Sequence, residues 1–323
     1  MSTELHQLIK DHLHKTLSST DFPNLGAKYS GKIRDNYSSN GQRILIVTDK
    51  LSAFDRIITE IPFKGQVLNQ LALFWFEKTK NICPNHAISS PDPNVLIATE
   101  CQALPIEMVV RGYITGSTST SIWHNYQKGV RNFCGNELPD GMTKNQKLAQ
   151  PIITPSTKAE KGDHDESVSK ADILAKGLVT EAEFDQMADY AMRLYNYGVE
   201  HCAKNGLIFV DTKYEFGKNK AGQIVLIDEM HTPDSSRFWL SETYEKRLAE
   251  GLEPDNINKE YLRLWLANQG YMGDGPMPEI TDEVRVETAI RYIQAYEQIT
   301  GEKFSPDLSP DPIARIEANL KAL

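Results

Sequence analysis

Residues 207–239 read LIFVDTKYEFGKNKAGQIVLIDEMHTPDSSRFW and predict the central element of the fold. Two apolar, β-rich runs at 207–210 and 224–227 flank a loop that contains glycine and lysine, which is typical of a β-hairpin. Because both runs are almost wholly apolar, we expect both strands to be buried.

Charged side chains follow both predicted strands at the same end of the hairpin. Asp211, Lys213 and Glu215 follow the first strand, and Asp228 and Glu229 follow the second. An isolated buried charge is costly, so we expect these groups to be paired or to hold a metal ion. Mg²⁺ prefers oxygen ligands, commonly one or two carboxylates together with nucleotide phosphates. The pattern favours an ATP–Mg²⁺ site, while solvated turn residues are the structural alternative.

The composition is that of a globular protein with one large domain or two to three smaller ones. A net charge of −9 argues against a general nucleic-acid-binding protein, but it is compatible with a locally basic site for phosphorylated metabolites. No apolar run approaches the ~18 residues that cross a bilayer, and residues 1–15 lack the apolar core of a signal peptide. The four scattered cysteines favour reduced thiols. We therefore expect a cytoplasmic protein that binds neither nucleic acid nor membrane.

A glycine-containing loop precedes a predicted strand at 43–48. Gly31, Lys32 and Arg34 supply backbone amides and cations that could cover phosphates. The loop is not a Walker P-loop, because the Gly-Lys-Ser/Thr ending and the strand-to-helix setting are absent. An ordinary hairpin turn is the alternative.

A further polar group follows the predicted strand 104–110. Arg111 ends this strand and Ser117 follows six residues later, which suits a bidentate anion contact with an added hydroxyl. A structural arginine paired with a neighbouring carboxylate is the alternative. Glu107, inside the strand, also needs a partner. The polar segment 232–237 strengthens the functional interpretation of the hairpin carboxylates.

Helical patterns account for much of the remaining chain. Thr180 and Glu183 form a capping box that begins a helix ending near residue 204. Little apolar periodicity occurs at 129–170, which indicates either a substrate lid or solvent-exposed chain. The chain after Arg237 shows no recognisable chemistry and is interpreted as packing structure. The other predicted helices are 4–17, 65–80, 119–128, 241–250, 258–268, 281–300 and one from residue 311.

Together these segments resemble the family of phosphoribosylaminoimidazole-succinocarboxamide synthase, or SAICAR synthetase. The resemblance covers nearly the whole chain, including the helical tail of the longer single-chain form, and the departures at Asn36 and Ala103 affect local packing only. The motifs are GKIRDNY at 31–37, PFKGQVLNQLALFWF at 62–76, LPIEMVVRGYITGS at 104–117, PIITPSTKAEKGDHDE at 151–166, VDTKYEFG at 210–217 and IDEMHTPDSSRFW at 227–239.

The resemblance implies an α+β fold in three parts. Residues 1–112 would form an antiparallel sheet domain that resembles a kinase small lobe. Residues 113–240 would form an ATP-grasp-like α+β domain, with ATP in the cleft between the two, and residues 241–323 a helical extension. We also expect a monomer.

The family motifs imply roles for individual residues. Gly31, Lys32 and Arg34 would cover the nucleotide phosphates, and Glu107 and Val109 would lie on the strand that contacts adenine. Lys213 would contact phosphate, while Glu215 and Asp228 would hold Mg²⁺. Arg111, Ser117 and Arg237 would clamp the 5′-phosphate of the ribonucleotide. The residues assigned to substrate are Arg111, Ser117, Lys158, Asp234, Ser235 and Arg237, and L-aspartate would lie near 154–166 or 49–56.

The implied reaction is an ATP-dependent carbon–nitrogen ligation in purine (IMP) biosynthesis. It joins L-aspartate to carboxyaminoimidazole ribonucleotide and gives SAICAR, ADP and phosphate. A carboxylate is a poor electrophile, so we expect a carboxyl phosphate that the amine of L-aspartate attacks. Lys213 would neutralise charge during phosphoryl transfer, and Asp211 and Asp234 are candidate general bases.

Two other classes remain as alternatives. A small-molecule or protein kinase would carry a His-Arg-Asp or Asp-Phe-Gly motif, and neither occurs in this sequence. A non-catalytic nucleotide sensor would not need a second anion clamp beside the metal carboxylates.

Overall fold

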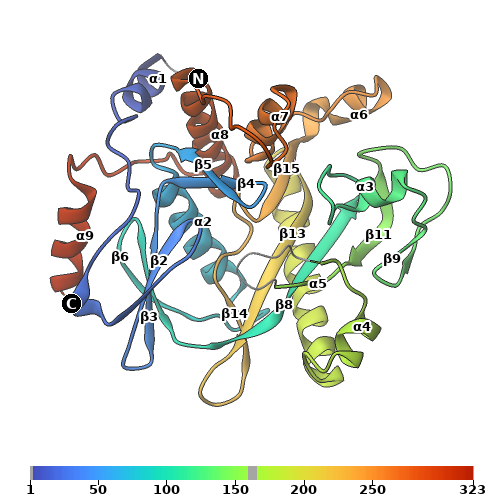
Figure 1. The fold of residues 1–323 in the computed structure, drawn as a ribbon, viewed down its shortest axis with the longest axis horizontal. Helices are drawn as coiled ribbons and strands as arrows, with labels where there is room; N and C mark the ends of the chain where they lie inside the picture. Colours follow the sequence, from blue (N-terminus) through green and yellow to red (C-terminus); the bar gives the residue numbers. More distant parts are fainter. Residues whose placement is uncertain (1–2, 159–165, 323) are drawn as a thin grey trace.

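The computed structural model describes residues 3–158 and 166–322 (Figure 1). A hairpin forms where it was predicted, because β13 (Leu207–Lys218) and β14 (Ile224–Ile227) pair antiparallel with Glu215 opposite Ile227. The predicted extent of its first strand is wrong: residues 215–218 pair with β14, while residues 207–209 pair with β15 (Ser236–Leu240). Every residue of β14 is buried. Asp211, Lys213 and Glu215 therefore lie within β13 and do not follow a shorter strand, and Glu215 comes beside Asp228 at the open end of the hairpin.

The larger sheet is built around β13. Its strand order is β11-β8-β13-β14, with β12 on β8 and β15 on β13, and all of these pairs are antiparallel. β8 pairs with β13 from Gln102 to Arg111, so a domain division at residue 112 would separate β8 from its partner. The added strands are β8 (Gln102–Tyr113), β11 (Lys147–Ile153), β12 (Ser156–Thr157) and β15 (Ser236–Leu240).

The smaller sheet has the strand order β1-β2-β3-β7-β6, beside a two-stranded hairpin of β4 and β5. Gly31 turns the chain between β1 and β2, where its amide donates to the Arg34 carbonyl over 2.8 Å. An isolated bridge from Asn85 to Leu226 joins this region to the larger sheet. The strands are β1 (Ala27–Ser30), β2 (Arg34–Ser39), β3 (Gln42–Val47), β4 (Lys50–Ala53), β5 (Arg56–Glu60), β6 (Ala87–Asp92) and β7 (Val95–Thr99).

The stretch 129–170, which we expected to be irregular, contains β11 and the short pair β9 (Asn132–Phe133) and β10 (Asn136–Glu137). β11 lies at the edge of the larger sheet, where proline and polar residues are tolerated. Pro151 and the polar Gln150 interrupt its apolar pattern, which explains why periodicity did not reveal the strand.

The predicted helices are present and differ at some ends, whereas the short helix at Lys170–Ala175 was not predicted. α5 begins at the predicted capping box, in which Thr180 and Glu183 exchange side-chain and backbone hydrogen bonds. α1 is shorter than the predicted 4–17. The helices are α1 (Thr3–Lys10), α2 (Lys64–Thr79), α3 (Ile122–Gln127), α4 (Lys170–Ala175), α5 (Glu181–Lys204), α6 (Ser241–Ala249), α7 (Glu260–Asn268), α8 (Asp282–Thr300) and α9 (Pro312–Lys321), with a 3₁₀ turn η1 at Pro23–Leu25.

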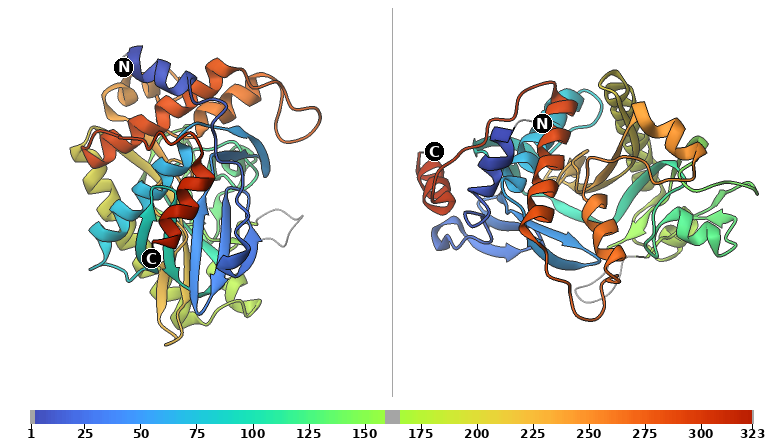
Figure 2. Two further views of the ribbon diagram at one scale, coloured as in Figure 1. Left: turned by 90° about the vertical axis from the view of Figure 1, so that its left-hand side faces the viewer. Right: turned by 90° about the horizontal axis from the view of Figure 1, so that it is seen from above.

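The C-terminal helices return to the N-terminal half of the chain. α8 packs against α1, α2 and α7 (Figure 2). α9 lies against β6, where Arg315 Nε is 2.8 Å from Asp92 Oδ2. Within the described residues, no helix combines the length and apolar character needed to span a membrane. Buried residues of α7 and α8 belong to the main hydrophobic core, and Ile316 of α9 belongs to a smaller one.

Candidate active site

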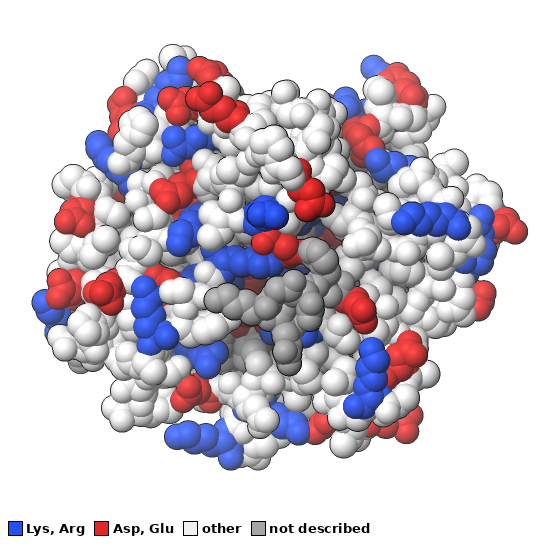
Figure 3. Space-filling model, in the orientation of Figure 1, with Lys and Arg blue, Asp and Glu red and all other residues white. Residues whose placement is uncertain are grey.

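Two neighbouring cavities lie between the sheets and the C-terminal helices. The first cavity, about 540 Å³, is lined by the β1–β2 turn, β13 and the residues after β14. The second cavity, about 280 Å³, is lined by β8, β13 and the start of β15. Lys and Arg side chains gather around this region of the surface (Figure 3). The residues that line both cavities are Phe54, Asp55, Lys213, Asp234, Lys259 and Arg263.

The two predicted metal ligands, Glu215 and Asp228, both line the first cavity. Arg34 Nη1 lies 2.9 Å from Asp228 Oδ1, and Arg34 Nη2 lies 2.5 Å from Glu229 Oε2. Glu215 pairs with Lys158 and, over 3.2 Å, with Lys213. The predicted pairing of these charges is therefore present.

The two carboxylates differ in their affinity for protons. Burial raises the pKa of Asp228 to about 6 against the attraction of Arg34, and the negative charge of Glu215 contributes to the increase. Burial also acts to raise the pKa of Glu215, but the attractions of Lys213 and Lys158 outweigh it and lower this pKa to about 2. Glu215 and Glu229 thus repel the charged form of Asp228, and a bound cation would relieve this repulsion.

Lys213 connects the two cavities through its neighbours on the sheet. Its ammonium lies 2.6 Å from Glu107 Oε1, so the glutamate inside β8 has the partner that it required. Burial opposes the charge on Lys213, but Glu107 and then Glu215 raise its pKa well above the ordinary value. Lys213 therefore stays protonated at neutral pH.

The second cavity holds two arginines on one carboxylate. Arg111 Nη1 and Arg237 Nη1 lie 3.3 and 2.5 Å from Asp211 Oδ2. Arg111 also donates from Nε to Thr154 Oγ1 over 2.8 Å. Arg111 thus pairs with a carboxylate, as the structural alternative predicted, and it also lines a cavity.

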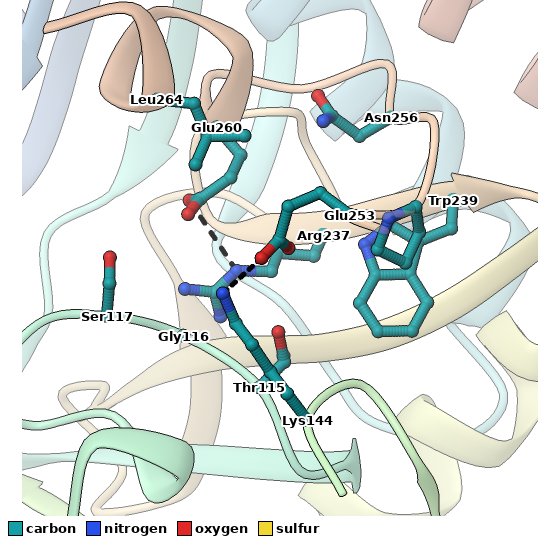
Figure 4. A pocket seen from close by; sticks show the side chains of 11 residues that line it. Thr115, Gly116, Ser117, Lys144, Arg237, Trp239, Glu253, Asn256, Glu260 and Leu264 are labelled. Carbon is teal, nitrogen blue, oxygen red and sulfur yellow. Dashed lines mark hydrogen bonds and ion pairs between the residues drawn. The ribbon is translucent and has the colours of Figure 1, made fainter. Parts of the chain in front are cut away.

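Ser117 lies beside Arg237 in a small adjoining pocket of about 20 Å³ (Figure 4). The Arg237 guanidinium points toward the side of the pocket where Ser117 lies. Glu260 stands 3.7 Å from Arg237 Nε, and Lys144 pairs with Glu253 across the pocket. The three predicted phosphate contacts therefore lie close together, although Ser117 does not line the second cavity itself.

Asp234, in the wall between the two cavities, is held by two buried side chains. Lys64 Nζ lies 2.8 Å from Asp234 Oδ2, and the Tyr292 hydroxyl donates to Asp234 Oδ1. Burial acts to raise the pKa of Asp234, but Lys64 and Lys259 lower it far below its ordinary value. Both candidate general bases, Asp211 and Asp234, thus lie in ion pairs.

The remaining predicted residues divide between the cavities. Lys158 lines the first cavity and Ser235 the second. Glu107 and Val109 line the second cavity, not the one that contains the Gly31 turn. Residues 159–165 of the predicted lid lie outside the described part of the chain.

The chain after Arg237, which was interpreted as packing structure, also contributes to the cavity walls, because α7 and the residue before it line both cavities. Lys259 and Arg263 face them from one side of the helix, four residues apart. Burial lowers the pKa of Lys259 to about 8, and Asp234 partly offsets this decrease. Two cations four residues apart near the start of a helix could have indicated a binding site, but the same pattern is common on solvent-exposed helix faces. Lys64 and Tyr292 were missed because both lie on apolar helix faces.

Comparisons with known proteins agree with this arrangement. The family model for SAICAR synthetase matches residues 27–278. Phosphoribosylaminoimidazole-succinocarboxamide synthase of Legionella pneumophila (strain Lens) is 51% identical over 298 residues, covering 92% of this chain and 95% of that protein. The chloroplastic enzyme of Arabidopsis thaliana is 51% identical over 310 residues, covering 94% and 75%.

Solved structures give the same result. SAICAR synthase from Saccharomyces cerevisiae complexed with SAICAR has a TM-score of 0.75 at 32% identity, covering 90% of this chain and 100% of that one. A SAICAR synthetase in complex with ADP has a TM-score of 0.66 at 25% identity, covering 87% and 100%. The mixed α/β architecture, the two adjoining cavities and these similarities lead to one conclusion: the chain belongs to the SAICAR synthetase family.

Proposed function

We propose that the protein is an ATP-dependent ligase that joins L-aspartate to the carboxylate of carboxyaminoimidazole ribonucleotide and forms SAICAR, ADP and phosphate. The observation that carries the proposal is the shared wall of the two cavities. One side presents paired carboxylates and cations suited to a metal–triphosphate, and the other presents two arginines suited to a phosphate. A single substrate would not need both.

The first cavity is the proposed nucleotide site. The Gly31 turn, Lys32 and Arg34 would cover the phosphates, as the glycine-rich loop of a kinase small lobe does, with Lys213 on the opposite, ATP-grasp-like side. Adenine would lie against the part of this cavity that includes Leu45, Cys101 and Ala103. We propose these residues in place of Glu107 and Val109, which line the other cavity.

Glu215 and Asp228 fit a magnesium ion that is shared with a nucleotide. Within residues 3–158 and 166–322, no group of three or more histidine, cysteine, aspartate or glutamate side chains is placed to hold a metal alone. Mg²⁺ in nucleotide enzymes commonly takes one or two carboxylates, and phosphates and water complete its shell. The ion would supply charge neutralisation at the transferred phosphoryl group.

The second cavity is the proposed ribonucleotide site. Arg111, Arg237 and Ser117 would contact the 5′-phosphate. Asp211 would orient both guanidinium groups, because each donates to the same carboxylate oxygen. This role replaces the general base that was considered for Asp211.

L-aspartate is proposed to bind at the shared wall. Its two carboxylates match Lys259 and Arg263, the cations that α7 and the preceding residue place in both cavities. The turn between β4 and β5, with Phe54 and Asp55, covers the same wall and includes part of the predicted 49–56 region.

The proposed chemistry needs no protein nucleophile. The imidazole carboxylate would attack the γ-phosphorus, which breaks the bond to ADP and forms a carboxyl phosphate. The aspartate amine would then form the C–N bond as inorganic phosphate leaves. The departing phosphate is itself a base and can take the amine proton. Lys213 would neutralise developing charge, and Asp234 would accept a hydrogen bond from the amine.

The test is a coupled assay with ATP, Mg²⁺ and the carboxylated ribonucleotide, with and without L-aspartate. We expect ADP and SAICAR to form in equal amounts only when L-aspartate is present. ADP release with the ribonucleotide alone would favour a kinase, and ATP binding without turnover would favour a nucleotide sensor. We also propose a monomer, because one chain lines both cavities; sedimentation at assay concentration tests this.

A further inference from the structure

We infer that Lys64 and Tyr292 are positioning residues that fix the Asp234 carboxylate in the wall between the two cavities. The inference rests on the proposed function, because it concerns how the amine of L-aspartate is received. It assigns a role to two side chains that line neither cavity.

The geometry of the three residues carries the inference. Lys64 is the first residue of α2, and its side chain is wholly buried. Its Nζ lies 2.8 Å from Asp234 Oδ2 and 5.7 Å from the centre of the Tyr292 ring. The hydroxyl of Tyr292, wholly buried on α8, donates to Asp234 Oδ1. Each carboxylate oxygen therefore has its own partner, and the two partners come from different helices.

A buried lysine at this position needs a reason. Burying an ammonium group that lacks a full set of hydrogen bonds costs on the order of several kcal/mol of folding free energy. A lysine is therefore rarely found in a protein core for packing alone. Asp234 lines both cavities in which the substrates are proposed to bind, and its two partners restrict the rotation of its carboxylate. The arrangement would hold Asp234 as an anion in one orientation, which suits a hydrogen-bond acceptor better than a proton acceptor.

Helix α8, which contributes Tyr292, lies beyond the part of the chain that the family model matches. The match ends at residue 278, while Tyr292 lies on α8 beyond it. α8 packs against both α2 and α7, so it contacts the helix of Lys64 and the helix that follows Lys259. The other charged groups that act on Asp234 or on its partner Tyr292 are Arg34, Glu229, Lys259 and Arg263.

The test compares Lys64→Met and Tyr292→Phe with matched controls on the same helices. Lys78→Met changes an exposed lysine of α2, and Tyr296→Phe removes a hydroxyl one turn further along α8. We expect the two test variants to lower kcat/KM for L-aspartate about tenfold or more, since a buried partner is lost. The KM for ATP should stay within about twofold, and both controls should match the wild type.

The pH profile separates positioning from general stability. Without its nearest cation, Asp234 should titrate nearer to the ordinary carboxyl range, so Lys64→Met should lose activity at acidic pH where the wild type is still active. Lys64→Arg should restore the wild-type profile. In an Asp234→Asn background, Lys64→Met should cause little further loss of kcat/KM, because the residues act as one unit.

Superimposable pH profiles together with additive losses in the double variant would overturn the inference. If Lys64→Met does not fold, Tyr292→Phe supports the same comparison with the loss of one oxygen atom. A wild-type protein that forms no SAICAR would refute the proposed function. Wild-type activity with unchanged variant profiles would refute the positioning role alone.

Discussion

Arg34 and Asp228, 194 positions apart in the chain, form an ion pair with Nη1 2.9 Å from Oδ1. The pair joins the smaller sheet to the end of the β13–β14 hairpin across the first cavity. Asp228 also has a left-handed backbone, with φ of 69°, a conformation that aspartate and asparagine tolerate better than most residues. Backbone strain and a buried charge thus coincide at a proposed metal ligand.

Replacing Asp228 by asparagine should therefore stabilise the ligand-free protein while removing its activity. The pKa of Asp228 is raised from 3.8 to about 6. Ionisation of this group therefore lowers the free energy of unfolding as pH rises from about 4 to 6, and the full destabilisation applies above this range. The asparagine side chain carries no charge, and we expect the free energy of unfolding at pH 8 to rise by about 1 kcal/mol. Turnover should fall about 100-fold or more.

Denaturant unfolding at pH 8 and pH 4 provides the measurement for Asp228→Asn. The gain in stability should shrink at pH 4, where the wild-type carboxyl is largely protonated. A variant with normal turnover would remove Asp228 from the metal site.

Arg237→Ala should raise the KM for the ribonucleotide about tenfold or more, because the proposed phosphate clamp loses a charged donor. The KM for ATP should change little, since Arg237 does not line the first cavity. Steady-state kinetics with each substrate varied would show the difference. Arg193→Ala, at an exposed arginine of α5, is the matched control. Equal effects on both substrates would argue against the clamp.

Binding of L-aspartate should weaken at alkaline pH. Lys259 makes no ion pair within the described residues, and burial lowers its pKa to about 8. As pH rises through 8 the ammonium loses its proton, so the KM for L-aspartate should increase. Lys259→Arg should remove this dependence, because arginine stays charged.

Lys259→Met should raise the KM for L-aspartate at every pH, whereas Lys246→Met, at an exposed lysine of α6, should not. The measurement is the KM for L-aspartate from pH 6.5 to 9 at saturating ATP and ribonucleotide. An unchanged KM in Lys259→Met would place L-aspartate elsewhere.

Thr180→Ala should lower stability without altering catalysis. Thr180 caps α5 by accepting from the Glu183 amide, and loss of such a cap costs about 1 kcal/mol. Neither Thr180 nor Glu183 lines either cavity. Thermal unfolding should show a lower Tm, and kcat measured well below that temperature should match the wild type. Reduced kcat would connect the start of α5 to the site.

The sequence predicted those features that depend on neighbours along the chain. A hairpin closed near residues 219–223 follows from the apolar runs and the turn residues, and the start of α5 follows from its capping box. The apolar run at 207–210 did not reveal that the strand continues through Asp211, Lys213 and Glu215. The convergence of Arg111 and Arg237 was predicted only through family resemblance, because their partner Asp211 shows no local sign of either contact.

Features that depend on distant segments were not predictable in this way. Lys259 and Arg263 resemble the solvated face of an amphipathic helix until the fold brings α7 to the cavities. Lys64 stands at the start of a strongly apolar helix, and its partner Asp234 is 170 positions away (64 to 234). Apolar periodicity indicates which face of a helix is buried, but it does not indicate which charged residue of another segment contacts that face.

The return of α7 and α8 to the N-terminal half has a consequence for biosynthesis. Asp234 receives its second partner only after residue 292 has emerged from the ribosome, and Lys259 is made after both sheets. A nascent or prematurely terminated chain thus contains the elements proposed to bind the triphosphate but lacks Lys259 and Tyr292, which are proposed to act on the amino acid. Vectorial synthesis would in this way delay ATP consumption until the polypeptide is nearly complete.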